Sequence, residues 1–167
     1  MKALLASSTL FIGLLLGDCS GGSSGNASLP SAQRRFPLKT LPTADVSLKG
    51  TTIKAWLATT PDQREEGLMF ISDSEITVGQ GMLFVFPNER DLAFWMKNTL
   101  IPLDIAFARA DGTIVAVHTM PPLTLESFPS FEPAMFALEL KSGVLGRIGA
   151  AVGDKLIVPA EVLKNVQ

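Results

Sequence analysis

The chain has 167 residues but only one cysteine, Cys19, and one histidine, His118. A single cysteine excludes a disulfide within the chain, so any folded domain must be held together by its hydrophobic core alone. The sequence also lacks the spaced cysteine and histidine pairs of a structural zinc site. We therefore predict neither a metal site nor a cofactor.

Charge is also sparse and nearly balanced. Charged residues make up 18% of the chain, the formal net charge is −2, and no run of lysine and arginine occurs. Domains that bind nucleic acid usually carry a concentrated basic patch. The sequence therefore argues against a nucleic acid as the partner.

The N-terminus is the most hydrophobic part of the chain. Lys2 precedes an apolar run over residues 3–17, which is short for a transmembrane helix and typical of the central region of a signal peptide. The next residues, Leu16-Gly17-Asp18-Cys19, resemble a bacterial lipoprotein signal, in which a leucine three residues before a cysteine precedes cleavage and lipidation of that cysteine. Asp18 departs from this pattern, because the residue before the cysteine is usually small and uncharged.

This resemblance implies export to the periplasm or cell envelope, with the membrane as a partner through a lipid on Cys19. Secretion with an ordinary signal peptide and an uncleaved membrane anchor are the alternatives. We expect a signal peptide over residues 1–19, a flexible Ser/Gly/Pro linker over 20–39 and a single domain over 40–167. We expect this domain to be a monomer.

The remaining sequence is typical of a mainly β domain. Apolar residues alternate on both sides of Gly50, which predicts a hairpin, and Thr60-Pro61-Asp62-Gln63 predicts a short capped helix that ends at Gly67. We predict a loop over 71–80 and a short helical turn over 142–150. Further strands are predicted over 81–87 (covered on both faces), 92–97, 103–109, 113–119, 135–140 and 156–158. This pattern indicates a small β-barrel or sandwich of about seven to nine short strands with one or two short helices.

Several runs in this region resemble one protein family. They are 67–69 (GLM), 81–86 (GMLFVF) and 94–107 (FWMKNTLIPLDIAF), with further matches over 111–115, 138–140 and 153–155. The sequence resembles the bacterial and archaeal family called domain of unknown function 192 from about residue 53 to 158. The resemblance implies a compact, mainly β fold, often behind a signal peptide, and it implies no particular reaction.

The expected strand register suggests a site. A hairpin around residues 98–101 places Trp95 opposite Asp104. A three-residue turn over 110–112 then places Asp104 opposite His118. A two-residue turn would instead place His118 against Ile105, which is less favourable for a polar ring.

We therefore predict one sheet face that carries Trp95, Lys97, Asp104 and His118, with Glu139 from a neighbouring strand and Asn98 from the loop. A tryptophan beside polar groups is suited to a small polar ligand, a glycan or a partner protein. An Asp104/His118 pair also permits hydrolase-like acid–base catalysis, although no nucleophile motif accompanies it. A purely structural Asp–His hydrogen bond is the third interpretation, so the sequence leaves open whether the protein is an enzyme.

Five methionines invite a comparison with copper(I) sites, because thioethers are soft ligands. They are Met69, Met82, Met96, Met120 and Met135. The first three stand beside leucine and phenylalanine, as in ordinary packing, and no M-x-x-M spacing occurs. Copper(I) binding is therefore a minor alternative.

Overall fold

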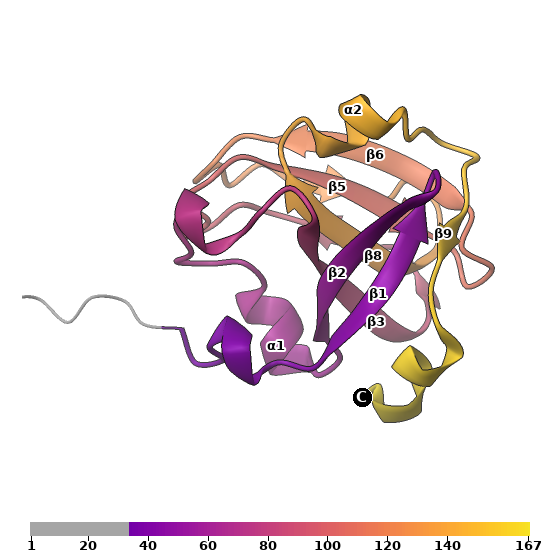
Figure 1. Ribbon diagram of the computed structural model, residues 1–167, viewed down its shortest axis with the longest axis horizontal. Helices are drawn as coiled ribbons and strands as arrows, with labels where there is room; N and C mark the ends of the chain where they lie inside the picture. Colours follow the sequence, from indigo (N-terminus) through magenta and orange to yellow (C-terminus); the bar gives the residue numbers. More distant parts are fainter. Residues whose placement is uncertain (1–33) are drawn as a thin grey trace, which may run out of the picture. The chain divides into compact units, whose positions relative to one another are not determined.

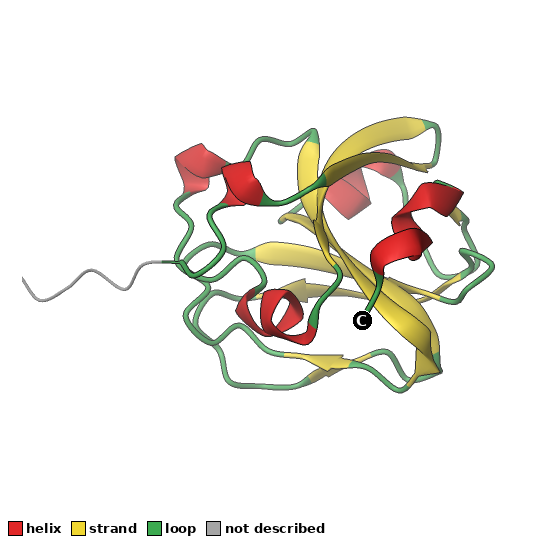
Figure 2. Cartoon of the chain, turned by 90° about the horizontal axis from the view of Figure 1, so that it is seen from below, coloured by secondary structure: helices red, strands yellow, loops and turns green. Residues whose placement is uncertain are grey.

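The computed structural model describes residues 34–167 (Figure 1). The predicted signal peptide, Cys19 and most of the predicted linker lie outside these residues. Figure 2 shows short helices beside strongly twisted strands, which confirms the prediction of a mainly β fold. The strands are β1 (Thr43–Leu48), β2 (Thr51–Ala58), β3 (Gln80–Arg90), β4 (Ala93–Phe94), β5 (Leu103–Ala108), β6 (Ile114–Met120), β7 (Phe128–Pro129), β8 (Ala134–Lys141) and β9 (Leu156–Ile157). The helices are α1 (Pro61–Glu66) and α2 (Val144–Ile148), with 3-10 turns η1 (Leu38–Thr40), η2 (Asp73–Glu75) and η3 (Ala160–Asn165).

Seven strands form one sheet in the order β6-β5-β8-β3-β2-β1-β9, and β4 pairs with β7 in a separate ribbon. Only β2 and β3 are parallel within the seven-stranded sheet. A parallel pair needs a crossover connection, and α1 lies in this connection. In Figure 1, β1 and β2 lie in front of β5 and β6, because the sheet curls into a half-barrel.

The first hairpin and the first helix follow from local sequence, as predicted. Lys49 and Gly50 both have positive φ, 54° and 74°, as a two-residue hairpin turn requires. The Thr60 hydroxyl accepts a hydrogen bond from the Gln63 backbone N–H at 3.3 Å, and the Gln63 side chain accepts one from the Thr60 N–H at 3.1 Å. This capping box starts α1, and Gly67 ends it.

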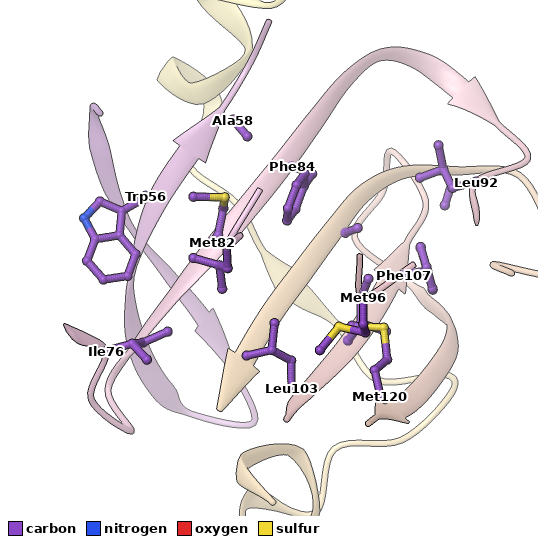
Figure 3. Close-up of a cluster of buried hydrophobic side chains, with 14 of the residues drawn as sticks. Trp56, Ala58, Ile76, Met82, Phe84, Leu92, Met96, Leu103, Phe107 and Met120 are labelled. Carbon is purple, nitrogen blue, oxygen red and sulfur yellow. The ribbon is translucent and has the colours of Figure 1, made fainter. Parts of the chain in front are cut away.

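Both faces of the sheet are buried. On β3, Met82 and Phe84 join one hydrophobic cluster, while Leu83 and Val85 join a second cluster on the opposite face. Figure 3 shows side chains of the first cluster, which come from several strands and from the segment that contains Met96. Val144 and Leu145 of α2, Leu156 of β9 and Val162 of η3 contribute to the second cluster. The prediction that this strand is covered on both faces is confirmed.

The two edges of the curled sheet meet at one end. Thr113, just before β6, forms a bridge to Lys155, just before β9. The Leu156 N–H donates a hydrogen bond to the Gly112 carbonyl at 2.9 Å, and β9 in turn pairs with β1. Gly112 has φ of 82°, and its α-carbon faces the Leu156 carbonyl so closely that no side chain fits.

Three predicted segments differ from the structure. The strand predicted over 92–97 is reduced to β4, which pairs with β7 and not with β5, so the expected hairpin around 98–101 is absent. The Met96 N–H donates to the Thr124 carbonyl, because the loop after β6 occupies the place expected for β5. The predicted loop over 71–80 contains η2, which has a capping box of its own. Residues 34–39, predicted as linker, make hydrogen bonds to α1 and the turn after it.

The Gly112 contact yields a stability prediction. Gly112→Ala is expected to lower the free energy of unfolding by about 2–4 kcal/mol, because the added Cβ would lie 2.2 Å from the Leu156 carbonyl oxygen. Gly146→Ala in α2 is the matched control, because nothing lies within 4 Å of its added Cβ. We expect this control to change the free energy by no more than about 1 kcal/mol. Urea unfolding measures the free energy of unfolding of both variants. Equal values would contradict the importance of the close contact between Gly112 and Leu156.

Candidate functional site

A groove runs between α1 and the segment over residues 90–98. It consists of two hollows, of about 500 and 190 Å³, and both are lined by Glu65 of α1 and by Trp95. Trp95 is 47% exposed. A large exposed aromatic residue within a groove is a common feature of ligand sites.

The structure brings together three of the predicted ligand-binding residues. Trp95, Lys97 and Asn98 all line the smaller hollow. The Lys97 ammonium lies 5.1 Å from the centre of the Trp95 ring, and within residues 34–167 it forms no ion pair. The Asn98 amide lies 3.9 Å from the Met69 sulfur. An aromatic ring, a free cation and an amide therefore share one small concave surface.

Glu139 lies beneath this surface. Its side chain lines a narrow cavity of about 30 Å³ together with Trp95, Met69 and Thr99. Glu139 is only 4% exposed, and its Oε2 atom has no hydrogen-bond partner among the described residues. Burial raises the pKa of this carboxyl to about 8, against a smaller opposing effect of the Arg34 charge.

The position of Glu139 follows from strand alternation. In the sheet, Glu139 of β8 is paired with Met82 of β3 on one side and with Ile105 of β5 on the other. Its side chain therefore points to the face of the first hydrophobic cluster, which contains both of these residues. The strand predicted over 135–140 is present as β8, and Glu139 lies on it as expected. The sequence did not predict that this face of the strand would be a covered, largely apolar interior.

A second buried carboxylate, Glu66 at the end of α1, holds the N-terminal strap, which we define as residues 34–36. Glu66 accepts hydrogen bonds from the backbone N–H groups of Arg35 at 2.5 Å and Phe36 at 2.9 Å. The Arg34 guanidinium lies 3.6 Å from Glu66 and donates to the Gly67 and Met69 carbonyls at 2.8 and 2.6 Å. The strap thus fixes the backbone that walls the Glu139 cavity, and sequence reasoning missed it because Arg34 lay within a polar, linker-like stretch.

Asp104 lies on the opposite face of the sheet from this groove. It is paired with Thr119, whose hydroxyl donates to one carboxylate oxygen at 2.8 Å, and the Leu145 N–H of α2 donates to the other at 3.0 Å. Asp104 is 2% exposed, so it is a buried acceptor that holds the start of α2 against β5.

The predicted pairing of Asp104 with His118 is therefore wrong. The predicted three-residue turn is present, with Arg109 bonded to Thr113 and Ala108 paired with Ile114. An irregularity between Ala108 and Phe107 then shifts the register by one residue, so His118 pairs with Ile105. A one-residue shift reverses the face of every following side chain.

His118 has a different environment from the one predicted. Its Nε2 atom lies 2.8 Å from the Pro129 carbonyl oxygen, and its ring packs against Phe107, Phe128 and Phe131. These contacts join β6 to the β7 segment. The hydrolase hypothesis required contact between Asp104 and His118, and the structure does not provide it.

The five methionines are divided among the first hydrophobic cluster, the groove and the second cluster. Met82, Met96 and Met120 are fully buried in the first hydrophobic cluster (Figure 3), Met69 lines the groove, and Met135 packs against the second cluster. Within residues 34–167, no three His, Cys, Asp or Glu side chains are grouped as a metal site would require. In the same range, none of the helices has the length and hydrophobicity needed to cross a membrane.

The surroundings of Asp104 predict a structural role. Asp104→Ala is expected to lower the free energy of unfolding by about 1–3 kcal/mol, because it leaves the buried Leu145 N–H without its acceptor. Thr119→Val is the matched control, because it removes only the hydrogen bond that the hydroxyl of the exposed residue Thr119 donates to the same carboxylate. We expect a smaller loss for this control in urea unfolding. A larger loss for Thr119→Val than for Asp104→Ala would contradict the assignment.

Two solved structures are similar to this domain. A protein of Sinorhizobium meliloti 1021, described as a candidate transcription regulator, is 36% identical; the match covers 70% of this chain and 93% of that protein, with a TM-score of 0.65. A protein of unknown function from Novosphingobium aromaticivorans DSM 12444 is 30% identical; the match covers 83% of this chain and 100% of that protein, with a TM-score of 0.68. No curated protein matches the chain.

The family suggested by the sequence runs is also matched directly. The family model DUF192, described as an uncharacterized ACR, matches residues 44–158. This range contains α1, the groove segment and Glu139, and it spans more than half of the chain. The protein therefore belongs to the DUF192 family.

Proposed function

We propose that this protein is an exported, membrane-tethered binding module that takes a small polar ligand in the groove beside Trp95. The observation that carries the proposal is the combination of three groups: an exposed Trp95, a Lys97 without an ion pair and a buried Glu139 whose Oε2 atom has no hydrogen-bond partner, the last two within residues 34–167. Sites for small ligands typically combine apolar walls with a few convergent polar groups. The groove has both.

The geometry favours binding over hydrolysis. Asp104 and His118 lie apart, and each has a structural partner of its own. None of the described side chains that line the two hollows and the Glu139 cavity is a serine, cysteine or histidine. The groups that do line them can orient a ligand through hydrogen bonds, charge and an aromatic face.

The proposed tether enters the domain close to the groove. The described chain begins at Arg34, which is bonded to the backbone next to the Glu139 cavity. A lipid on Cys19 would therefore hold the groove near a membrane surface, where ligands of the cell envelope are concentrated. The lipoprotein-like run at residues 16–19 supports this part of the proposal.

Binding can be tested through the two tryptophans, Trp56 and Trp95. We expect at least one compound in a panel of monosaccharides, uronic acids and amino acids to shift the Trp95 indole N–H signal in NMR and to leave that of the largely buried Trp56 in place. In isothermal titration calorimetry, which does not need the Trp95 signal, Trp95→Ala should weaken binding at least tenfold, because it removes the main apolar contact. Leu100→Ala is the matched control, since Leu100 is 51% exposed and lies outside the groove lining. A panel that leaves Trp95 unmoved would overturn the proposal.

Lipidation can be tested separately in bacterial cells. With the chain expressed from its own N-terminus, we expect a clickable fatty acid to label the wild-type protein and the protein to sediment with membranes. Cys19→Ser should abolish the label, because the thiol is the proposed attachment atom. An exported but unlabelled wild-type protein would contradict the tether and favour secretion with an ordinary signal peptide.

A further inference from the structure

Glu139 is the strongest unexplained feature of the described residues. Its side chain is 4% exposed and lines the 30 Å³ cavity, and its Oε2 atom has no hydrogen-bond partner among the described residues. Buried polar atoms without a partner are rare in folded proteins, because each one costs free energy. An acceptor or donor supplied from outside the chain would remove this cost.

The neighbouring charges do not satisfy Glu139. Arg34 donates to the Gly67 and Met69 carbonyls and lies beside Glu66. Arg64 of α1 also lines the cavity, but its guanidinium donates to the carbonyls of Thr59, Val85 and Gln167. The other titratable groups that line the cavity are Glu65 and Glu66 of α1, while β3 and β5 place Met82 and Ile105 next to Glu139. Burial disfavours the charged form of Glu139 and raises the pKa of its carboxyl, and the positive charge of Arg34 opposes this only in part.

A protonated carboxyl can donate a hydrogen bond, so an acceptor from a ligand can supply the missing partner. The cavity is large enough for one water-sized group. Its lining includes three aromatic residues, Phe84, Phe94 and Trp95, and one residue with a hydroxyl group, Thr99. A hydroxyl or carbonyl oxygen fits this space, whereas an ammonium group would enter a region that already has the positive charge of Arg34 nearby.

The charged residues that line the smaller hollow restrict the chemical class of the ligand further. Lys97 and Arg35 line the smaller hollow, and the Lys97 ammonium stands by the Trp95 ring. Arg35 is already paired with Asp62 and Glu65, which leaves Lys97 as the cation of the smaller hollow that has no ion pair among the described residues. An aromatic ring beside a free cation is suited to a sugar that carries a carboxylate.

We propose that the groove binds an acidic sugar, whose carboxylate faces Lys97 and one of whose hydroxyl groups enters the cavity and accepts a hydrogen bond from Glu139. This inference rests on the proposed function, since it names the ligand class for the same groove. The hydroxyl takes the place at Oε2 that no residue in the described part of the chain fills.

The proposal has a defined dependence on pH. Because burial raises the pKa of Glu139 to about 8, the donating form is present below this value and is lost as the pH rises through it. Between pH 7 and 9 the neutral fraction falls about tenfold. The affinity for an acidic sugar should fall by a similar factor.

The test uses the purified full-length chain with galacturonic acid as the probe and galactose as its uncharged counterpart. Titrations at pH 7 and pH 9, followed through the Trp95 indole signal, give the two dissociation constants. We expect wild-type affinity for galacturonic acid to fall about tenfold at pH 9, and galactose to bind more weakly at pH 7. Glu139→Gln keeps an N–H donor of similar size, so it should bind at both pH values with little difference between them. Glu139→Leu should bind at least tenfold more weakly at pH 7.

The outcomes separate this inference from the proposed function. Galacturonic acid that shifts Trp95 with the same affinity at both pH values, in the wild type and in Glu139→Gln alike, would overturn the role of Glu139 and leave the groove as a binding site. A response of Trp95 to other panel compounds but not to galacturonic acid would overturn the ligand class. If Glu139→Leu fails to fold, the comparison of Glu139→Gln with the wild type still decides the matter.

Discussion

Burial of the central sheet on both faces is the constraint on which the groove depends. The side chains of β3 alternate between two hydrophobic clusters, so each face needs a covering layer. Elements late in the sequence, α2 and η3, help cover one face. The other face is covered by the short helix α1, by the segment around Met96 and by the strap over residues 34–36. The groove lies between these covering segments. The carboxyl of Glu139 is buried because it occupies one position of this alternation.

Glu66 and Glu139 are both buried, but their surroundings differ. Glu66 accepts hydrogen bonds from two backbone N–H groups of the strap and lies close to the Arg34 guanidinium. These contacts attach the strap to α1. Glu139 has no such donors within residues 34–167, and its charged form is correspondingly disfavoured. The described residues supply the hydrogen-bond partners of Glu66, so this carboxylate has a structural role. The Glu139 carboxyl is left for a ligand to complete.

Local signals in the sequence were sufficient for much of the fold. The Thr60 capping box, the turn at Gly50 and the continuous apolar run of β3 each depend on residues within a few positions of one another, and all three are confirmed. The position of His118 depended instead on an irregularity beside Phe107, where one extra residue reverses the face of a whole strand. Trp95, Lys97 and Asn98 could be predicted to share a site because they are close in sequence. Arg34 and Glu66 could not be, because their contact joins distant segments and leaves no periodic signal.

The backbone around the groove supports a ligand role for this surface. Phe70 and Asn98 both have positive φ, 63° and 57°, and the Phe70 N–H donates a hydrogen bond to the Asn98 carbonyl at 2.9 Å. Asparagine tolerates this conformation, but for a residue as bulky as phenylalanine it costs about 1–3 kcal/mol. Both residues line the smaller hollow beside Lys97. Strain of this kind persists where the surrounding structure holds it, and it is concentrated at ligand sites. The hydrogen bond between Phe70 and Asn98 fixes the backbone next to Lys97, so this part of the groove is organised before any ligand arrives.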